Sequence, residues 1–374
     1  MLKKITSLCS LLLLLSAASE AEIAQPAVAL TLAQANKQGS EHLSTLLVLE
    51  EKGTTLKAFD LSEHYNSYPE DPLDIVSSKG YEEILSVVDS SKLKTYQLDE
   101  LKLSPVIGTQ HIAAGTNYRA HQEETNIHSG FLFPKISKPT PFFSQVKTSP
   151  DVLLDYEVEL CVRFQERVMS KENFDRVVKG FFLCGDMSDR ALLLRTIDVD
   201  NQASGIGFTD AKSGDDRFPV GPYTVVPKNW QNFIGSVELS TEVNGVQRQK
   251  SNASKMIKKT DTLVEDVLRI GANKNWLYGD RSIPLIDNAY IEKGSVILTG
   301  TPEGVIFQSI TLTKKIMWGA QWALSFSFLD SSAVQYVLEK AIESGFESGR
   351  YLQPGDSVKL SGTFLGSINL IVTQ

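Results

Sequence analysis

Short apolar or alternating runs dominate the chain and are interrupted by glycine and proline. Runs of about four to eight residues with such breaks are typical of β-strands. The clearest strand candidates are Glu157 to Phe164, Gly180 to Cys184, Val237 to Val243, Ser295 to Thr299, Val358 to Ser361 and Ile368 to Val372. Many short strands in one chain predict a mixed, β-rich α+β fold built as a sandwich or roll of mixed sheets.

Two longer stretches have helical spacing instead, Ser254 to Ile270 and Ser332 to Gly345. In the second, Ser332 and Gln335 predict a capping box at the start, and Gly345 is predicted to end the helix. Its apolar face consists of Val334, Val337, Leu338, Ala341 and Ile342.

The N-terminal third has a pattern of its own. Leu46 to Leu49 and Leu56 to Phe59 predict two strands joined by a glycine-containing turn, and Tyr81 to Val88 predicts a helix. We therefore expect a small N-terminal β/α domain over residues 45–105 and a larger catalytic domain over residues 106–374. Residues 22–44, rich in Ala and Gln with little patterning, are expected to form a spacer.

The first 21 residues have the three parts of a secretory signal peptide. Lys3 and Lys4 precede an apolar run that is much shorter than the roughly 20 residues of a membrane span, and small residues follow up to Ala21. Cleavage after Ala21 would leave a mature chain that begins at Glu22. We therefore expect a periplasmic or secreted protein without an integral membrane span, with a cytoplasmic location as the alternative.

Composition narrows the function classes. The chain has 37 Lys and Arg against 45 Asp and Glu, a formal net charge of −8, and 42% hydrophobic residues. A nucleic-acid binder needs clustered positive charge, so this balance argues against nucleic acid as a partner. The hydrophobic content is that of an ordinary globular protein with a sizeable packed core.

Three acidic residues stand out because they lie beside apolar runs. The strand period places Glu157 and Glu159 on one face, and Asp186 follows the run Gly180 to Gly185. Unpaired charge is costly in such a setting, although a bare Glu-x-Glu is more often a solvated strand face. Three clustered carboxylates would suit a hard cation such as magnesium, manganese or calcium.

Other residues could supply acid–base chemistry. His121 and Glu124 are three residues apart, so one helical turn would bring the carboxylate beside the imidazole and support the histidine as a base. A surface ion pair is the simpler interpretation of that spacing alone. Lys212 and Arg190 could bind an anion or stand free in solvent.

Six motifs occur in a fixed order and together resemble those of the fumarylacetoacetate hydrolase family. They are Gly115-Thr116-Asn117-Tyr118 with His121 and Glu124, Asp155 to Leu160, Asp186 with Arg190, Lys212-Ser213, Val243-Asn244-Gly245 with Gln249, and Leu298 to Val305. The turn Pro354-Gly355-Asp356 fits as well. The resemblance covers about Thr45 to Val372 and implies a mixed β-sandwich roll around a divalent metal, usually Mg²⁺, with Mn²⁺ or Ca²⁺ as alternatives. It also makes a homodimer plausible.

The resemblance assigns a role to each matching residue. Glu157, Glu159 and Asp186 would be the metal ligands, His121, Glu124 and Lys212 the catalytic residues, and Arg190, Thr301 and Tyr118 the substrate-binding residues. The implied substrate is a small oxo acid. Its two oxygens would chelate the metal, which would stabilise the enolate formed when a carbon–carbon bond breaks.

Some positions depart from the family pattern. Ala191 and Leu193 stand where family members often carry Asp and Gln, so a polar substrate contact is lost at Leu193. Residues 306–351 and 258–291 are longer than the usual connections, and either could be a lid, an interface or decoration.

These observations favour a metal-dependent hydrolase that cleaves a carbon–carbon bond in a β-diketo or acylpyruvate-type acid. A 2-oxo-acid decarboxylase, hydratase or isomerase of the same family is the second hypothesis, because enolate stabilisation serves all of these reactions. An exported binding protein that has lost turnover is the third.

Cleavage of the signal peptide would leave two cysteines, Cys161 and Cys184. If their strands pair antiparallel with Glu159 opposite Asp186, the same register puts Cys161 opposite Cys184. A disulfide could then form in an oxidising compartment, but two free buried thiols are the favoured interpretation.

Overall fold

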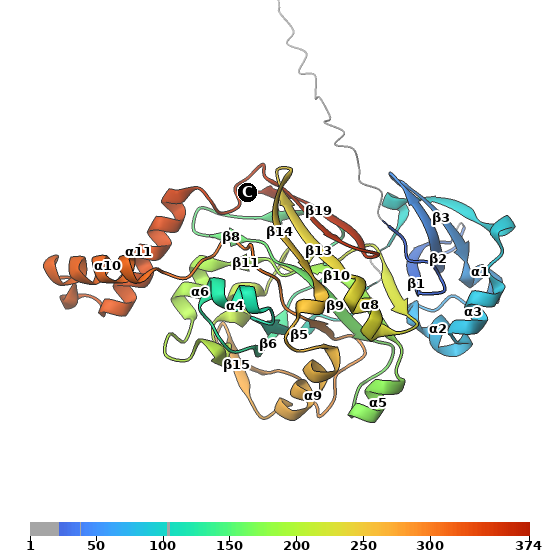
Figure 1. The fold of residues 1–374 in the computed structure, drawn as a ribbon, viewed down its shortest axis with the longest axis horizontal. Helices are drawn as coiled ribbons and strands as arrows, with labels where there is room; N and C mark the ends of the chain where they lie inside the picture. The colour runs from blue at the N-terminus through green and yellow to red at the C-terminus, as the bar shows by residue number, and fades with distance from the viewer. Residues whose placement is uncertain (1–21, 38, 103–104) are drawn as a thin grey trace, which may run out of the picture.

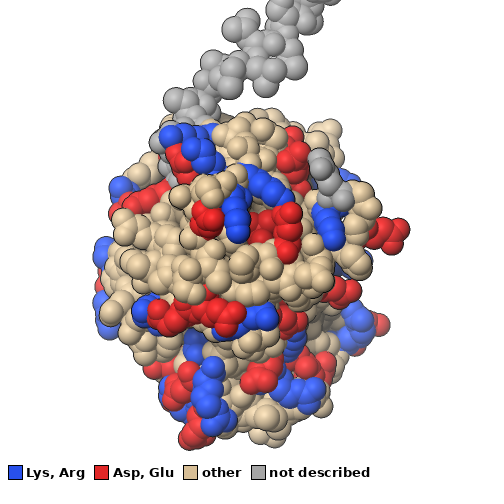
Figure 2. All heavy atoms as spheres, turned by 90° about the vertical axis from the view of Figure 1, so that its right-hand side faces the viewer, with Lys and Arg blue, Asp and Glu red and all other residues tan. Residues whose placement is uncertain are grey.

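The computed structural model describes residues 22–37, 39–102 and 105–374, so the expected signal peptide lies outside the described residues. Helices surround several mixed sheets, and the predicted β-rich α+β class is confirmed (Figure 1). No helix of the described residues is both long and apolar enough to span a membrane. On the face shown in Figure 2, acidic and basic side chains are interspersed, so neither sign of charge dominates it.

Among the described residues, a ten-stranded sheet has the order β4-β3-β2-β1-β12-β10-β9-β17-β5-β6. All neighbours are antiparallel except β17 and β5. Its strands are β4 (Lys94–Gln97), β3 (Thr55–Asp60), β2 (Leu43–Lys52), β1 (Ala29–Asn36), β12 (Thr224–Pro227), β10 (Lys179–Gly185), β9 (Val158–Phe164), β17 (Val296–Leu298), β5 (Gln110–Gly115) and β6 (Phe131–Ile136). The predicted strands of the larger domain from Glu157, Gly180 and Ser295 are therefore confirmed within one sheet.

A five-stranded sheet has the order β14-β13-β18-β19-β7, with β19 and β7 parallel. Its strands are β14 (Val246–Asn252), β13 (Glu238–Val243), β18 (Ser357–Gly362), β19 (Gly366–Thr373) and β7 (Phe143–Lys147). Leu239 and Leu360 of this sheet share one buried core with Leu160 and Leu183 of the larger sheet. The two sheets therefore form a sandwich, as expected. Two small pairs complete the strands, β8 (Leu154–Asp155) with β11 (Ser188–Asp189) and β15 (Asn275–Tyr278) with β16 (Arg281–Pro284).

The expected spacer is wrong over part of its length. Residues Ala29–Asn36 form β1, which pairs with β2 on one side and β12 on the other. Because β1 is buried along nearly its whole length, its sequence lacks the polar alternation that identifies a half-exposed strand. This strand joins the N-terminal unit to the sheet that carries the site.

The N-terminal unit has its own apolar core. Helices α1 (Leu61–Tyr65), α2 (Leu73–Lys79) and α3 (Tyr81–Val87) pack there against β1, β2 and β3. Leu30, Leu47, Phe59, Leu73 and Ile84 are buried members of this core. The predicted strands at 46–49 and 56–59 and the predicted helix from Tyr81 are confirmed.

Six further helices lie around the large sheet. They are α4 (Arg119–Thr125), α5 (Lys171–Arg176), α6 (Arg190–Thr196), α7 (Phe208–Lys212), α8 (Trp230–Ser236) and α9 (Thr260–Ile270). Short 3-10 helices occur at Ser90–Lys92, Leu98–Glu100, Gln202–Ser204, Ala253–Lys255 and Ser327–Leu329. The helix predicted from Ser254 begins only at Thr260, because a separate 3-10 turn, in which Asn252 accepts from the Ser254 amide, precedes it.

Helices α10 (Leu312–Leu324) and α11 (Ala333–Ser348) form a hairpin within the long connection 306–351 and project from the body (Figure 1). Ser332 caps α11 by accepting from the Gln335 amide, which is one half of the predicted capping box. The predicted end at Gly345 is wrong: α11 continues to Ser348, and Gly349 caps it with a left-handed φ of 59°. Gly345 instead permits close packing, since a Cβ there would lie 2.7 Å from Leu153 Cδ1.

Candidate active site

Three acidic side chains predicted to be metal ligands come together in the structure. One ligand oxygen from each of Glu157, Glu159 and Asp186 lies within 4.8 Å of the others, and all three residues are buried. Glu157 directly precedes β9, Glu159 lies within it, and Asp186 directly follows β10. The Asp186 amide donates to the Glu157 carbonyl at 2.9 Å, which aligns the two strand ends.

Lys212, at the end of α7, neutralises part of this negative charge. Its Nζ lies 2.7 Å from Glu157 Oε2, 2.9 Å from Asp186 Oδ2 and 2.7 Å from Ser188 Oγ. A lysine ammonium has three N–H donors, so these contacts use all of them. The predicted catalytic lysine is thus held against two of the three carboxylates.

Lys135 is a further cation of the cluster that the sequence analysis missed. Its Nζ lies 2.6 Å from Asp186 Oδ1, donates to the carbonyls of Lys212 and Arg217, and the whole residue is buried. The available signal was one lysine in the otherwise apolar run Phe131–Ile136 of β6. A charge inside a buried strand requires a partner, and Asp186 is that partner.

Arg190 is the first residue of α6 and joins two acidic residues. Its Nε donates to Asp155 Oδ2 at 2.8 Å, and its Nη2 donates to Glu157 Oε1 at 2.6 Å. Asp155, to which the sequence analysis assigned no role, also accepts from the amides of Ile306 and Phe307. Asp155 therefore links the carboxylate cluster to the start of the connection that carries the hairpin.

The pKa values of the cluster differ according to the neighbours of each group. Burial disfavours the charge of Glu157, but Lys212 and Arg190 outweigh it and lower the pKa to about 2. Burial, together with the charges of Asp186 and Glu157, raises the pKa of Glu159 well above its usual range. Glu159 accepts a hydrogen bond from the Gly300 amide at 2.6 Å, and among the described residues it forms no ion pair with a lysine or arginine. A bound divalent cation would provide the missing positive charge, so this donor set fits a hard metal ion.

His121 and Glu124 lie on one face of α4, as their spacing predicted. His121 Nδ1 lies 3.0 Å from Glu124 Oε2, which also accepts from the Gly304 amide. The Nδ1 proton is therefore directed at the carboxylate, which leaves Nε2 as the basic nitrogen. Before α4, Thr116 has a φ of 52°, a strained value for a β-branched residue.

The turn after β17 closes over the same region. Thr301 Oγ1 donates to the Val158 carbonyl and accepts from Gln249 Nε2, so its hydroxyl holds the turn in place. Gly304 has a φ of +101°, and a Cβ there would lie 2.2 Å from the Arg248 carbonyl oxygen. Only glycine fits that position without displacing the backbone.

Tyr118 is fully buried at the start of α4, and its hydroxyl has no hydrogen-bond partner among the described residues. Burial and then the charges of Glu159 and Glu303 raise its pKa, so the hydroxyl stays protonated. Unlike the other predicted substrate-binding residues, Tyr118 does not line the cavity beside the cluster.

A cavity of about 440 Å³ brings most of the predicted residues together. Its polar lining residues include His121, Glu157, Arg190, Lys212 and Thr301. Side chains from α6, α10 and α11 form much of the remaining wall, so the hairpin contributes directly to the site. A volume of this size is typical of a small-molecule site.

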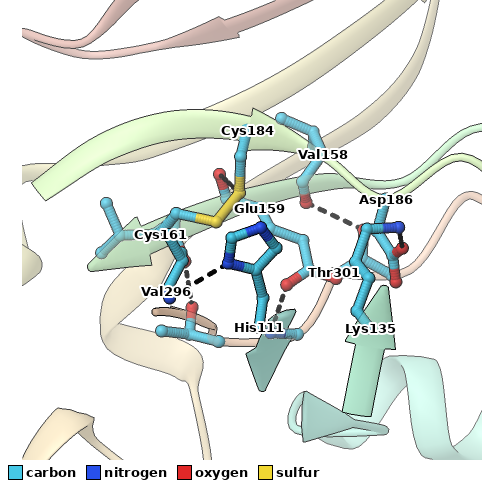
Figure 3. The surroundings of a disulfide bond; sticks show 12 residues. His111, Lys135, Val158, Glu159, Cys161, Cys184, Asp186, Val296 and Thr301 are labelled. Atoms are coloured by element: carbon cyan, nitrogen blue, oxygen red, sulfur yellow. Dashed lines mark hydrogen bonds and ion pairs between the residues drawn. A yellow bond between two sulfur atoms is a disulfide. The ribbon is translucent and has the colours of Figure 1, made fainter. Parts of the chain in front are cut away.

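A disulfide bond between Cys161 and Cys184 lies beside the cluster (Figure 3). The favoured expectation of two free thiols is therefore wrong. The expected register is wrong as well, because Cys184 stands opposite Glu159 and Cys161 opposite Phe182. The pairing differs by two residues, which keeps each side chain on its predicted face and makes the cysteines diagonal neighbours with Cα atoms 5.9 Å apart.

The fold and the site define a sandwich protein with a buried carboxylate cluster beside a histidine–glutamate pair. Residues 110–373 match the family model described as fumarylacetoacetate (FAA) hydrolase C-terminal. The chain therefore belongs to the fumarylacetoacetate hydrolase family. Among curated proteins, it is 25% identical over 303 residues to an uncharacterised protein of Staphylococcus aureus strain USA300, covering 78% of this chain and 79% of the relative.

Solved structures share the fold at low identity. A fumarylacetoacetate hydrolase from Exiguobacterium antarcticum superimposes with a TM-score of 0.56 at 21% identity, covering 92% of this chain and 99% of the other. A 2-hydroxyhepta-2,4-diene-1,7-dioate isomerase from Mycobacterium marinum gives 0.54 at 17%, covering 92% and 98%. The structures similar to this chain thus include a hydrolase and an isomerase.

Proposed function

We propose that the protein is a divalent-metal-dependent hydrolase that cleaves a carbon–carbon bond in a β-diketo or acylpyruvate-type acid. The observation that carries the proposal is the meeting of three buried carboxylates and the His121–Glu124 pair beside one cavity. The carboxylates supply oxygen ligands for a hard cation, and the pair supplies a base.

Charge balance supports an anionic substrate. With every carboxylate ionised, as in a metal-bound site, the cluster has one more negative than positive side chain. Its members are Asp155, Glu157, Glu159 and Asp186 against Lys135, Lys212 and Arg190. A divalent cation would reverse that to one net positive charge. A monoanionic 2-oxo acid would then restore neutrality in this buried setting, where unbalanced charge is costly.

The residues would divide the reaction between them. When bound at Glu157, Glu159 and Asp186, the cation would supply Lewis-acid polarisation of the oxo-acid oxygens. His121 Nε2, with Nδ1 held by Glu124, takes a proton from water as the water oxygen attacks the acyl carbonyl carbon. The bond between that carbon and the adjacent methylene breaks, its electron pair passes to the pyruvate part as an enolate, and a proton returns to the methylene carbon. The products are a carboxylate and pyruvate.

Lys212 and Arg190 would orient the substrate. Lys212 can exchange its contact with Ser188 Oγ for a substrate oxygen while it keeps both carboxylate contacts. Arg190 is held by Asp155 and Glu157, so its position at the cavity is set before a substrate arrives. For Tyr118, we propose a supporting role behind the cluster in place of direct substrate contact.

A decarboxylase, hydratase or isomerase is the second candidate, and the isomerase among the similar structures favours keeping it. The deciding experiment is turnover of acylpyruvates and oxaloacetate with added Mg²⁺ or Mn²⁺ and identification of the products. Two carboxylic products indicate the hydrolase, and carbon dioxide, a hydrated product or an isomer indicates the second candidate.

Two variants complete this experiment. Glu159→Gln should abolish metal-dependent turnover, while Glu172→Gln on exposed α5 is the matched control and should retain it. Metal binding without turnover of any compound in the panel would favour the third hypothesis, an exported binding protein.

We also propose that the protein is exported, with the mature chain beginning at Glu22. The buried Cys161–Cys184 disulfide supports an oxidising compartment. Sequencing the N-terminus of the protein from fractionated cells tests this, and an intact Met1 in the cytoplasmic fraction would argue against export.

A homodimer is the assembly we propose. Several large apolar side chains of the hairpin are exposed, which supports a contact surface there. They are Leu312, Ile316, Met317, Leu324, Phe326, Phe328 and Leu329. Light scattering of the purified protein measures the assembly directly, and a monomeric mass at all concentrations would exclude this proposal.

A further inference from the structure

The cavity beside the carboxylate cluster has a polar part and an apolar part that come from different elements. His121, Glu157 and Lys212 provide the polar part. The apolar part lies between α6 and α11, far apart in sequence but packed together, with Ala191 and Leu194 of α6 and Ile342 of α11 in one buried cluster. This arrangement divides the site into a head-group end and an apolar compartment.

Helix α6 leads from one part to the other. It begins at Arg190, which is held by the cluster, and ends at Thr196. Leu193 and Leu194 of the helix and Ile197, the residue directly after it, line the cavity. Seven residues of helix rise about 10 Å, so the apolar wall extends about that far from the cluster. The spacing of these residues keeps them on one side of the helix.

Helix α11 supplies the opposite wall. Val334, Val337 and Leu338 line the cavity and have the spacing of one helix face. Although Val334 is 51% exposed, it and its two neighbours face a compartment whose other wall is also apolar. The hairpin therefore places an apolar surface opposite α6 where a substrate's distal group would lie.

We infer that the substrate carries an extended apolar acyl group, and that this group is held between α6 and α11 while its dioxo-acid head lies at the carboxylate cluster. Leu193 and Leu194 are buried and cannot hydrogen-bond a polar distal group. The identity of the head rests on the proposed function, whereas the preference for an apolar tail rests on the two helical walls.

A distal carboxylate is the competing chemistry, because Lys315 of α10 also lines the cavity. Lys315 is exposed, and the cavity is lined by the exposed Asp200 as well. An opposite charge beside solvent weakens any preference for an anion at that position. The apolar walls, in contrast, gain from every methylene group that leaves water.

The first test is a series of acylpyruvates from acetylpyruvate to decanoylpyruvate, assayed with Mg²⁺. We expect kcat/KM to rise about fourfold for each added methylene until the compartment is filled. Val334→Asp and Val337→Asp should remove most of this rise. Val246→Asp on β14 is the matched control, since Val246 is 53% exposed and lies outside the cavity, and it should preserve the rise. Because Val334 is half exposed, its variant should remain folded even if Val337→Asp does not.

The second test separates binding from chemistry. Calorimetric titration with 2-oxo acids of matched length, which lack the second carbonyl and cannot be cleaved, should give affinities that rise with length and fall in Val334→Asp. Length-dependent binding without turnover of any acylpyruvate would contradict the proposed hydrolase but support the apolar compartment. Turnover of acylpyruvates that does not depend on chain length would support the proposed hydrolase and overturn the inference of an apolar compartment. Preference for a dioxo acid ending in a carboxylate, lost in Lys315→Ala, would overturn it as well.

Discussion

Cys184 stands directly opposite Glu159 in the β9–β10 ladder, and its sulfur lies 3.6 Å from the Glu159 carbonyl oxygen. The disulfide to Cys161 thus joins the two strands that present the carboxylate cluster, and both cysteines are fully buried. The covalent link holds the strands in register at the position where one of the proposed metal ligands leaves the sheet.

Removal of this disulfide should lower stability. The two cysteines are 23 residues apart, and closing a loop of that size is expected to contribute about 3 kcal/mol through the unfolded chain. Thermal unfolding of Cys161→Ala/Cys184→Ala against the parent protein measures the effect. A thiol count on denatured, non-reduced protein should find neither cysteine free, and two free thiols at these positions would contradict the bond.

Lys135 should be important for stability because it compensates buried charge. Lys135→Met removes the donor to Asp186 Oδ1 and to the Lys212 carbonyl, and it leaves Lys212 as the remaining cation on Asp186. We therefore expect the free energy of unfolding to fall by about 3 kcal/mol. Added Mg²⁺ should raise the melting temperature of this variant more than that of the parent protein, because the cluster then has more excess negative charge. Exposed Lys250→Met on β14 is the matched control. An unchanged stability of Lys135→Met would show that the contact to Asp186 is not needed.

His111 should make stability depend on pH. Burial, reinforced by the Lys135 charge, lowers the pKa of His111 from 6.5 to about 3. The neutral ring donates from Nε2 to the Ser137 carbonyl. Its Nδ1 accepts from the Val296 amide (Figure 3). The pKa of His111 is lower in the folded state than in the unfolded state. The contribution of this histidine to the free energy of unfolding is therefore fully present above about pH 6.5. It is lost as the pH falls toward 3, by about 1.4 kcal/mol per pH unit.

Replacement of this histidine by a group that does not titrate tests the assignment. His111→Gln can donate to the Ser137 carbonyl and accept from the Val296 amide, and it carries no ionisable group. Between pH 7 and pH 5, the parent should lose about 2 kcal/mol more than His111→Gln in urea unfolding. Parallel pH profiles for the two proteins would assign the acid sensitivity to other groups.

Gly304→Ala should impair both the turn and the histidine–glutamate pair. The added Cβ would lie 2.2 Å from the Arg248 carbonyl oxygen at a φ of +101°, and the Gly304 amide donates to Glu124. We expect a loss of about 1–3 kcal/mol in stability. Activity per folded molecule should also fall. Gly235→Ala in α8 has nothing within 4 Å of its Cβ and is the matched control.

Much of the site could be predicted from local spacing. Glu157 and Glu159 share a strand face, and His121 and Glu124 are one helical turn apart, so each pair is brought together by its own element. The backbone period alone determines such relationships. The order of the motifs also identified the family before any contact was known.

Other features depended on which elements meet in space. Lys135 belongs to the cluster because β6, at the edge of the large sheet, packs against α7, and its lysine meets Asp186 beside the end of that helix. No local pattern indicates that neighbour. The pairing of Cys161 with Cys184 required the true register, which the alternation of side chains leaves undecided by steps of two residues. Strand β1 was missed because it is buried on both faces and therefore lacks alternation.

The sequence by itself thus determined the fold class, the family, and the residues that share a face within one strand or helix. Only the tertiary structure decided that the 306–351 connection lines the cavity, that Lys135 completes the cluster and that Tyr118 lies away from the cavity. The physical reason is that the backbone period relates near neighbours in the chain, whereas contacts between distant segments follow from how whole elements pack.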